Sequence, residues 1–145
     1  MKAIINAKIL LDDVFVEGKV LLFDQKIEKI VDKLEMIDGE IIDAAGAYVC
    51  AGFIDLHIHG NGGADVMDAT PEALETISGS LLQTGTTSFL ATTMTMSTQY
   101  IDNALQNIQQ YASKVTGAHI VVIHLEGPFI NAVKHGAQDK MFVQK

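Results

Sequence analysis

The chain has 145 residues, of which 48% are hydrophobic, and this length and composition predict one ordinary globular domain with a sizeable core. Its formal net charge of -8, from 10 Lys and Arg against 18 Asp and Glu, comes without any basic run and argues against a nucleic-acid partner. No apolar stretch approaches the ~20 residues of a membrane span, which argues against a membrane partner. The single cysteine, Cys50, cannot form an internal disulfide, and the amino terminus has no signal-peptide pattern. These two features predict a cytoplasmic protein.

Short β-strands are predicted up to about Tyr48. Five segments contain the β-branched and alternating residues typical of strands, at positions 3–11, 14–17, 19–23, 26–31 and 40–43. Gly18 and Gly39 lie between such segments and are predicted turn residues. The pattern indicates a small sheet made of hairpins.

A different pattern begins at Gly52. Residues 53–57 lack the polar alternation of a strand with one wet face, which predicts a parallel sheet covered on both faces. Thr70 as N-cap and Pro71 at the first helical position predict a helix that Gly85 closes. The apolar stripe of this helix comprises Leu74, Ile77, Leu81 and Leu82.

One more helix and two more strands follow. Residues 87–92 predict a strand, and a helix is predicted from near Ser97 to Gly117. Its apolar face comprises Ile101, Ala104, Leu105, Ile108, Tyr111, Ala112 and Val115. Residues 119–125 predict the third strand, so the order is β-α-β-α-β, and right-handed crossovers make the three strands parallel neighbours.

Candidate metal ligands lie at the end of the first of these strands. Because side chains alternate along a strand, Asp55, His57 and His59 are predicted to project to one side, with His59 nearest the carboxyl end. Ligands bind at that end of parallel α/β sheets, and two neutral imidazoles suit zinc or a similar divalent ion. The spacing is equally compatible with two structural histidines bonded to backbone carbonyls.

Glu126 is predicted to stand at the same sheet edge, because it follows the third strand. A buried acid needs a partner, so this carboxylate could complete a metal cluster, and the alternative is a residue that caps a loop. His124 shares the parity of Glu126 and could also be a ligand, but it is expected to lie in the core or behind the ligands. His119, at the opposite end of the strand, is expected to be structural.

Three segments, GFIDLHIHGNGGADVMDA, TGTTSFLATT and HLEGPFINAVKHGAQ, resemble the amidohydrolase superfamily and, within it, the N-acetylglucosamine-6-phosphate deacetylase family. The resemblance implies an α/β fold, with the first strands of a (β/α)8 metal-dependent hydrolase barrel in residues 51–145 and the amino-terminal part of a small β-domain in residues 1–50. It also implies that Glu126, His57 and His59 bind a divalent metal, zinc or iron, and that Ala137 and Gln138 bind substrate. Relatives that keep both histidines resemble two-metal enzymes.

The implied activity is hydrolysis of the acetamide of N-acetylglucosamine 6-phosphate to glucosamine 6-phosphate and acetate. No residue of this chain matches the family's catalytic aspartate or its two later metal-binding histidines. We therefore expect a truncated product or amino-terminal fragment, inactive alone and a homodimer when complete. Two alternatives stay open: another metal-dependent amidohydrolase, such as a cyclic amidase or deaminase, and an inactive fragment that only binds or assembles.

Overall fold

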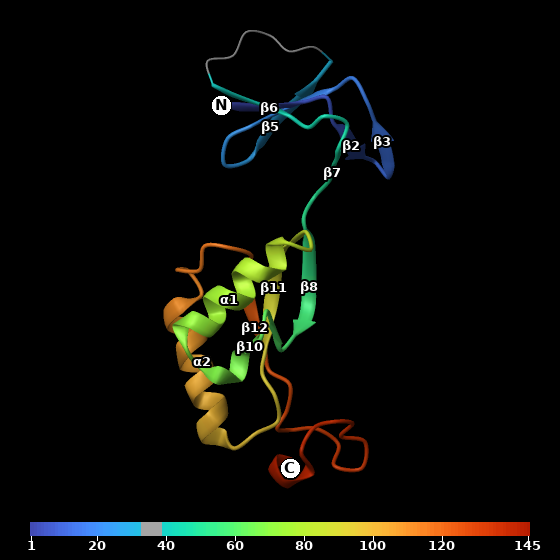
Figure 1. Cartoon of the computed structure of the whole chain (residues 1–145). Helices are drawn as coiled ribbons and strands as arrows, with labels where there is room; N and C mark the ends of the chain where they lie inside the picture. The colour runs from blue at the N-terminus through green and yellow to red at the C-terminus, as the bar shows by residue number, and fades with distance from the viewer. Residues whose placement is uncertain (33–38) are drawn as a thin grey trace. The chain divides into compact units, whose positions relative to one another are not determined.

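The computed structural model describes residues 1–32 and 39–145, and it divides into two compact units, Met1–Ala51 and Gly52–Lys145 (Figure 1). In the described part of the chain, no helix has the length and apolar character needed to cross a membrane.

The first unit consists of two small sheets. The larger has the order β5-β4-β1-β6, and its strands are β1 (Lys2–Ile5), β4 (Val20–Phe23), β5 (Ile27–Val31) and β6 (Glu40–Asp43). The smaller has the order β3-β2-β7, and its strands are β2 (Lys8–Leu11), β3 (Val14–Val16) and β7 (Tyr48–Val49). The predicted hairpins are present as β2–β3 and β4–β5, but β1–β6 and β2–β7 pair in parallel, which the hairpin prediction missed.

The single strand predicted at 3–11 is wrong, because Asn6 interrupts it. Asn6 has φ 54°, in the left-handed region, and this turn sends β1 and β2 into different sheets. The Asn6 side-chain amide donates to Asp43 Oδ1 over 3.0 Å, and the N–H of Ala45 donates to the same oxygen over 2.8 Å. These bonds, the one from Ala45 above all, hold the pKa of Asp43 below its usual value.

The second unit is built on a parallel sheet of order β12-β11-β8, as the sequence predicts (Figure 1). The sheet strands are β8 (Phe53–Ile58), β11 (Thr86–Thr92) and β12 (His119–His124), connected by α1 (Pro71–Leu82) and α2 (Thr98–Tyr111). A small antiparallel pair, β9 (Gly60–Asn61) and β10 (Ala64–Asp65), and the short helix η1 (Val66–Asp68) follow β8. A second short helix, η2 (Lys140–Phe142), lies near the end of the chain.

Capping fixes the start of α1, and α2 ends earlier than the sequence predicts. Thr70 Oγ1 accepts the N–H of Ala73 over 3.2 Å, as predicted for an N-cap. The second helix ends at Tyr111 and not near Gly117. Beyond the end of the helix, the N–H of Thr116 donates to Glu75 of α1 over 3.1 Å.

Both helices cover one face of the sheet, so the predicted coverage of both faces is wrong for the described residues (Figure 1). The two crossovers run in the same direction across the sheet, and crossovers of the same hand then place both helices on the same side. The core there contains Val66, Leu74, Ile77, Leu81, Phe89, Ala91, Ile108, Ala118 and Ile120. Leu82, predicted to belong to the stripe, is 46% exposed.

Large apolar side chains of the outer strands remain exposed. We call this group the exposed apolar set, and it comprises Phe53, Ile54, Leu56, Val121 and Val122, each more than half exposed. In the described chain, β8 and β12 are also the two edges of their sheet.

Candidate metal centre

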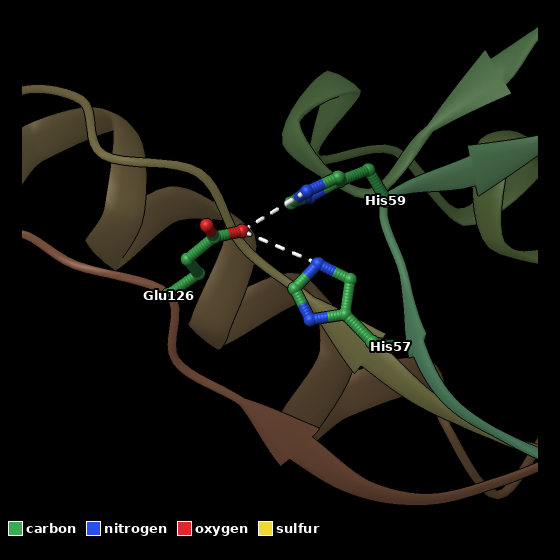
Figure 2. Close-up of side chains that lie close together, drawn as sticks. All are labelled: His57, His59 and Glu126. Carbon is green, nitrogen blue, oxygen red and sulfur yellow. Dashed lines mark ion pairs between the residues drawn. The ribbon is translucent and has the colours of Figure 1, made fainter. Parts of the chain in front are cut away.

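The paired histidines lie at the carboxyl end of β8. His57 is inside the strand and His59 directly follows it. The two rings are in an edge-to-face arrangement with centroids 5.0 Å apart, and both turn toward Glu126 (Figure 2). The two imidazoles therefore face the same point, as the sequence predicts.

Glu126 approaches both histidines from the segment after β12. Its Oε2 atom lies 3.1 Å from His59 Nε2 and 3.4 Å from His57 Nε2 (Figure 2). The three potential ligand atoms lie within 4.8 Å of one another, and they form the only such group of three or more in the part of the chain that the structure describes. The prediction that Glu126 stands at the same sheet edge as His59 is confirmed.

The backbone of β11 sets the orientation of the His59 ring. His59 Nδ1 lies 3.2 Å from the carbonyl oxygen of Thr92, which can only accept a hydrogen bond, so Nδ1 carries a proton. In the neutral ring, Nε2 then presents a lone pair toward Glu126. A bare nitrogen facing a carboxylate is repulsive unless a proton or a metal ion lies between them. The convergence of a third ligand atom, from His57, favours a shared metal ion.

Unsatisfied polar atoms gather at this edge. Four buried side-chain atoms lack a hydrogen-bond partner among the described residues: Thr93 Oγ1, Thr95 Oγ1, His124 Nδ1 and Glu126 Oε2. All four belong to residues at or just after the carboxyl ends of β11 and β12. Folded proteins leave few buried polar groups unpaired, so this concentration indicates a place for a polar ligand. Two imidazole nitrogens and a carboxylate oxygen are a suitable donor set for zinc or iron.

The close approach of two loops fixes the position of Glu126. Gly127 has φ 72°, and a Cβ at this residue would lie 1.9 Å from Thr95 Oγ1. The N–H of Thr93 donates to the carbonyl of His124 over 3.0 Å, which ties the same two loops together. Only glycine fits at position 127, both in conformation and in space.

The remaining candidates occupy different places. His124 packs against His57, with ring centroids 4.9 Å apart, but is not in the ligand group, and His119 is exposed at the start of β12. Asp55 does not join the histidines, because its Oδ1 accepts the N–H of His57 over 3.0 Å.

Gln138 is attached to the loop after β11, whereas Ala137 is exposed. Gln138 is buried, and its Oε1 accepts the N–H of Thr95 over 2.7 Å. Contact of either residue with a substrate stays a prediction. The sequence reasoning missed Thr92, Thr93 and Thr95, although a run of threonines directly after an apolar strand was a visible sign of a polar sheet edge.

Comparisons with known proteins give a consistent result. A family model described as "Amidohydrolase family" matches residues 48–136. N-acetylglucosamine-6-phosphate deacetylase of Bacillus subtilis is 39% identical over 92% of this chain and 35% of its own length. The same-named protein of Lysinibacillus sphaericus is 37% identical over 82% of this chain and 31% of its own length.

The fold agrees with that of solved structures. The crystal structure of N-acetylglucosamine-6-phosphate deacetylase from Pasteurella multocida superposes with a TM-score of 0.85 and 28% identity. The match covers 99% of this chain and 38% of that one. The chain spans about a third of the length of the curated relatives it matches. The predicted α/β fold, with the first strands of a barrel after a small β-rich segment, is confirmed.

Proposed function

The chain belongs to the amidohydrolase family, and we propose from that premise that it supplies a metal site to an enzyme hydrolysing the acetamide of N-acetylglucosamine 6-phosphate. The convergence of His57, His59 and Glu126 on one point carries this proposal. The 39% identity to a protein named for that reaction supports the choice of an amino-sugar phosphate as substrate. The products would be glucosamine 6-phosphate and acetate.

Membership of this family implies a divalent metal ion, and we propose zinc or iron. Glu126 would bind it together with His57 and His59. When bound, such an ion supplies an activated water and polarises the amide carbonyl. The carbonyl of Thr92 holds His59 in the tautomer with a free Nε2, and Gly127 lets Glu126 reach the same point.

Substrate contacts are proposed for Ala137 and Gln138. The hydrogen bond from the N–H of Thr95 to Gln138 Oε1 supports this proposal, because it attaches the Gln138 side chain to the loop that follows β11, at the same sheet edge as the metal ligands. We propose no general base among the residues of this chain. The two units would be the amino-terminal part of a small β-domain and the first β/α units of the barrel, in a cytoplasmic homodimer.

A hybrid enzyme tests the function. In this hybrid enzyme, residues 1–145 replace the matching segment of the Bacillus subtilis relative. The product is measured for each of three substrates: acetate from N-acetylglucosamine 6-phosphate, the ring-opened acid from a cyclic amide and ammonia from an aminopurine. We expect turnover of the sugar phosphate alone. In Glu126→Ala the rate of turnover should fall by more than about 100-fold, which is more than the loss typical of changing a residue that only hydrogen-bonds to a metal ligand.

The control is His119→Ala, at the opposite end of β12, which should leave the rate unchanged. A folded, metal-loaded hybrid enzyme that hydrolyses the cyclic amide or the aminopurine, but not the sugar phosphate, would contradict the proposed substrate. Near-normal turnover with full metal content in Glu126→Ala would contradict the proposed ligand.

A further inference from the structure

Strand β8 contains one extra residue at Leu56 and His57, where the first of the two metal-site histidines lies. Phe89 of β11 pairs with Asp55, and Ala91 pairs with Ile58. Two residues, Leu56 and His57, therefore lie opposite the single residue Leu90. Such a β-bulge breaks the regular ladder and redirects the side chains next to it, and bulges are common beside active sites.

Side chains take up the backbone donors at this bulge. The N–H of His57 donates to Asp55 Oδ1 over 3.0 Å, and the N–H of Ile58 donates to Thr92 Oγ1 over 3.1 Å. The Thr92 hydroxyl in turn donates to the carbonyl of Leu90 over 3.1 Å, and Thr92 is completely buried. Two consecutive N–H groups of β8 are thus held by side-chain oxygens.

The same two residues control both imidazoles. Asp55 holds the main chain at His57, while Thr92 holds Ile58 with its hydroxyl and the His59 ring with its carbonyl oxygen. An aspartate reaches the N–H two residues ahead because its carboxylate is close to its own backbone. This bond occupies Asp55 Oδ1 inside its own strand, and Asp55 is not in the ligand group.

We propose that Asp55 and Thr92 are positioning residues that clamp the bulge in β8 and thereby direct His57 and His59 toward Glu126. The proposal rests on the metal site proposed above. Asp55 acts through a hydrogen bond and not through its charge, so asparagine can replace it. Thr92 acts through its hydroxyl, so serine can replace it and valine, of the same shape, cannot.

Metal affinity tests the clamp. Equilibrium dialysis of Zn²⁺ and Co²⁺ is performed with the 145-residue chain and with four variants whose far-ultraviolet circular dichroism matches it. We expect Asp55→Ala and Thr92→Val to weaken binding about 10–100-fold, and Asp55→Asn and Thr92→Ser to stay within about threefold. The visible spectrum of bound Co²⁺ should change only in the first two variants.

A matched control separates positioning from general stability. Ser78→Ala removes another completely buried hydroxyl, which donates to the carbonyl of Ala118 over 2.8 Å and connects α1 to the start of β12. It should lower stability but leave metal affinity unchanged. If Ser78→Ala weakens metal binding as much as Asp55→Ala and Thr92→Val do, those two substitutions act only by destabilising the fold, and the proposal is overturned.

Hydrogen exchange provides a readout that does not need the metal. In the metal-free chain, Asp55→Ala should speed hydrogen exchange at the amide of His57, and Thr92→Val should speed it at the amide of Ile58. Exchange at both amides should stay slow in Asp55→Asn and Thr92→Ser. If Asp55→Asn weakens metal binding as much as Asp55→Ala, charge and not the bond is responsible, and the clamp is wrong. Unchanged affinity in Asp55→Ala and Thr92→Val overturns it too. If neither the unaltered chain nor the hybrid enzyme binds metal, the proposed metal site fails, and the exchange rates still decide whether the clamp exists.

Discussion

Gly127 determines the direction of the chain directly after Glu126. Its φ of 72° disfavours any other residue, and a Cβ would clash with the Thr95 side chain. Gly127→Ala should therefore combine conformational strain of about 1–3 kcal/mol with a displaced Glu126. We expect a lower free energy of unfolding in urea and a weaker metal site.

Gly63→Ala is the control for this substitution. Gly63 also has a positive φ, of 85°, but open space surrounds the position of its Cβ. This variant should show the conformational cost alone, with metal affinity kept. Equal metal affinity in Gly127→Ala and the unaltered chain would show that the approach to Thr95 does not position Glu126.

We expect the histidine pair to determine how many ions the complete site binds. The hybrid enzyme should contain two divalent ions per chain, and replacing both His57 and His59 by alanine should remove one of them, because Glu126 alone then remains from this group. Elemental analysis of metal per protein measures the change. An unchanged metal content in the double variant would mean that the two histidines are structural. Their spacing in the sequence is equally compatible with that role.

At the scale of the elements, Asp43 links the end of β6 to the turn between β1 and β2 and makes the first unit sensitive to acid. Its pKa is lowered by the bonds from Ala45 and Asn6, so the folded state holds the proton less tightly than the unfolded state. The resulting stability is present above the unfolded pKa and is lost as the pH falls through the folded pKa.

We therefore expect the melting temperature of the first unit to fall below pH ~4, modestly because the carboxylate is exposed. Circular dichroism melts over a pH series measure this fall. Asp43→Ala should lower stability at neutral pH and remove this part of the pH dependence. Asp43→Asn should remove the pH dependence while keeping an acceptor for both bonds. If the melting temperature of Asp43→Asn still falls steeply in acid, other carboxylates are responsible for the pH dependence.

Local signals predicted the elements well, and long-range contacts account for the errors. Thr70 and Pro71 mark the start of α1 in the sequence, and the parity of His57 and His59 correctly predicted that they face one way. The bulge could not be predicted, because it exists only relative to β11. The bond from Thr116 to Glu75, far away in the sequence, could not be predicted from the residues around α2 either.

At the scale of the whole molecule, the exposed apolar set predicts self-association of the 145-residue chain. Phe53 and Val121 lie on the two edge strands of the described sheet, which also present unpaired backbone groups. We expect sedimentation as species larger than a monomer, without acetate release from the sugar phosphate. Replacing both residues by lysine should shift the distribution toward the monomer, because charges on edge strands oppose pairing.

Tyr100→Lys is the control, because Tyr100 is a similarly exposed aromatic residue on α2, away from the strands. It should not change the sedimentation. A cooperatively unfolding monomer of the unaltered chain that releases acetate would contradict both parts of this prediction.

The ligand group draws on β8 and on the segment after β12, and takes nothing from β11 between them. An ion bound there would therefore bridge the two flanking strands and enclose both helical crossovers in one large loop. The ends of this loop meet at the site when α1 and α2 are both in place, so we expect metal capture late in folding. Metal release would in turn remove a cross-link from the native state and speed its first opening at the edge strands.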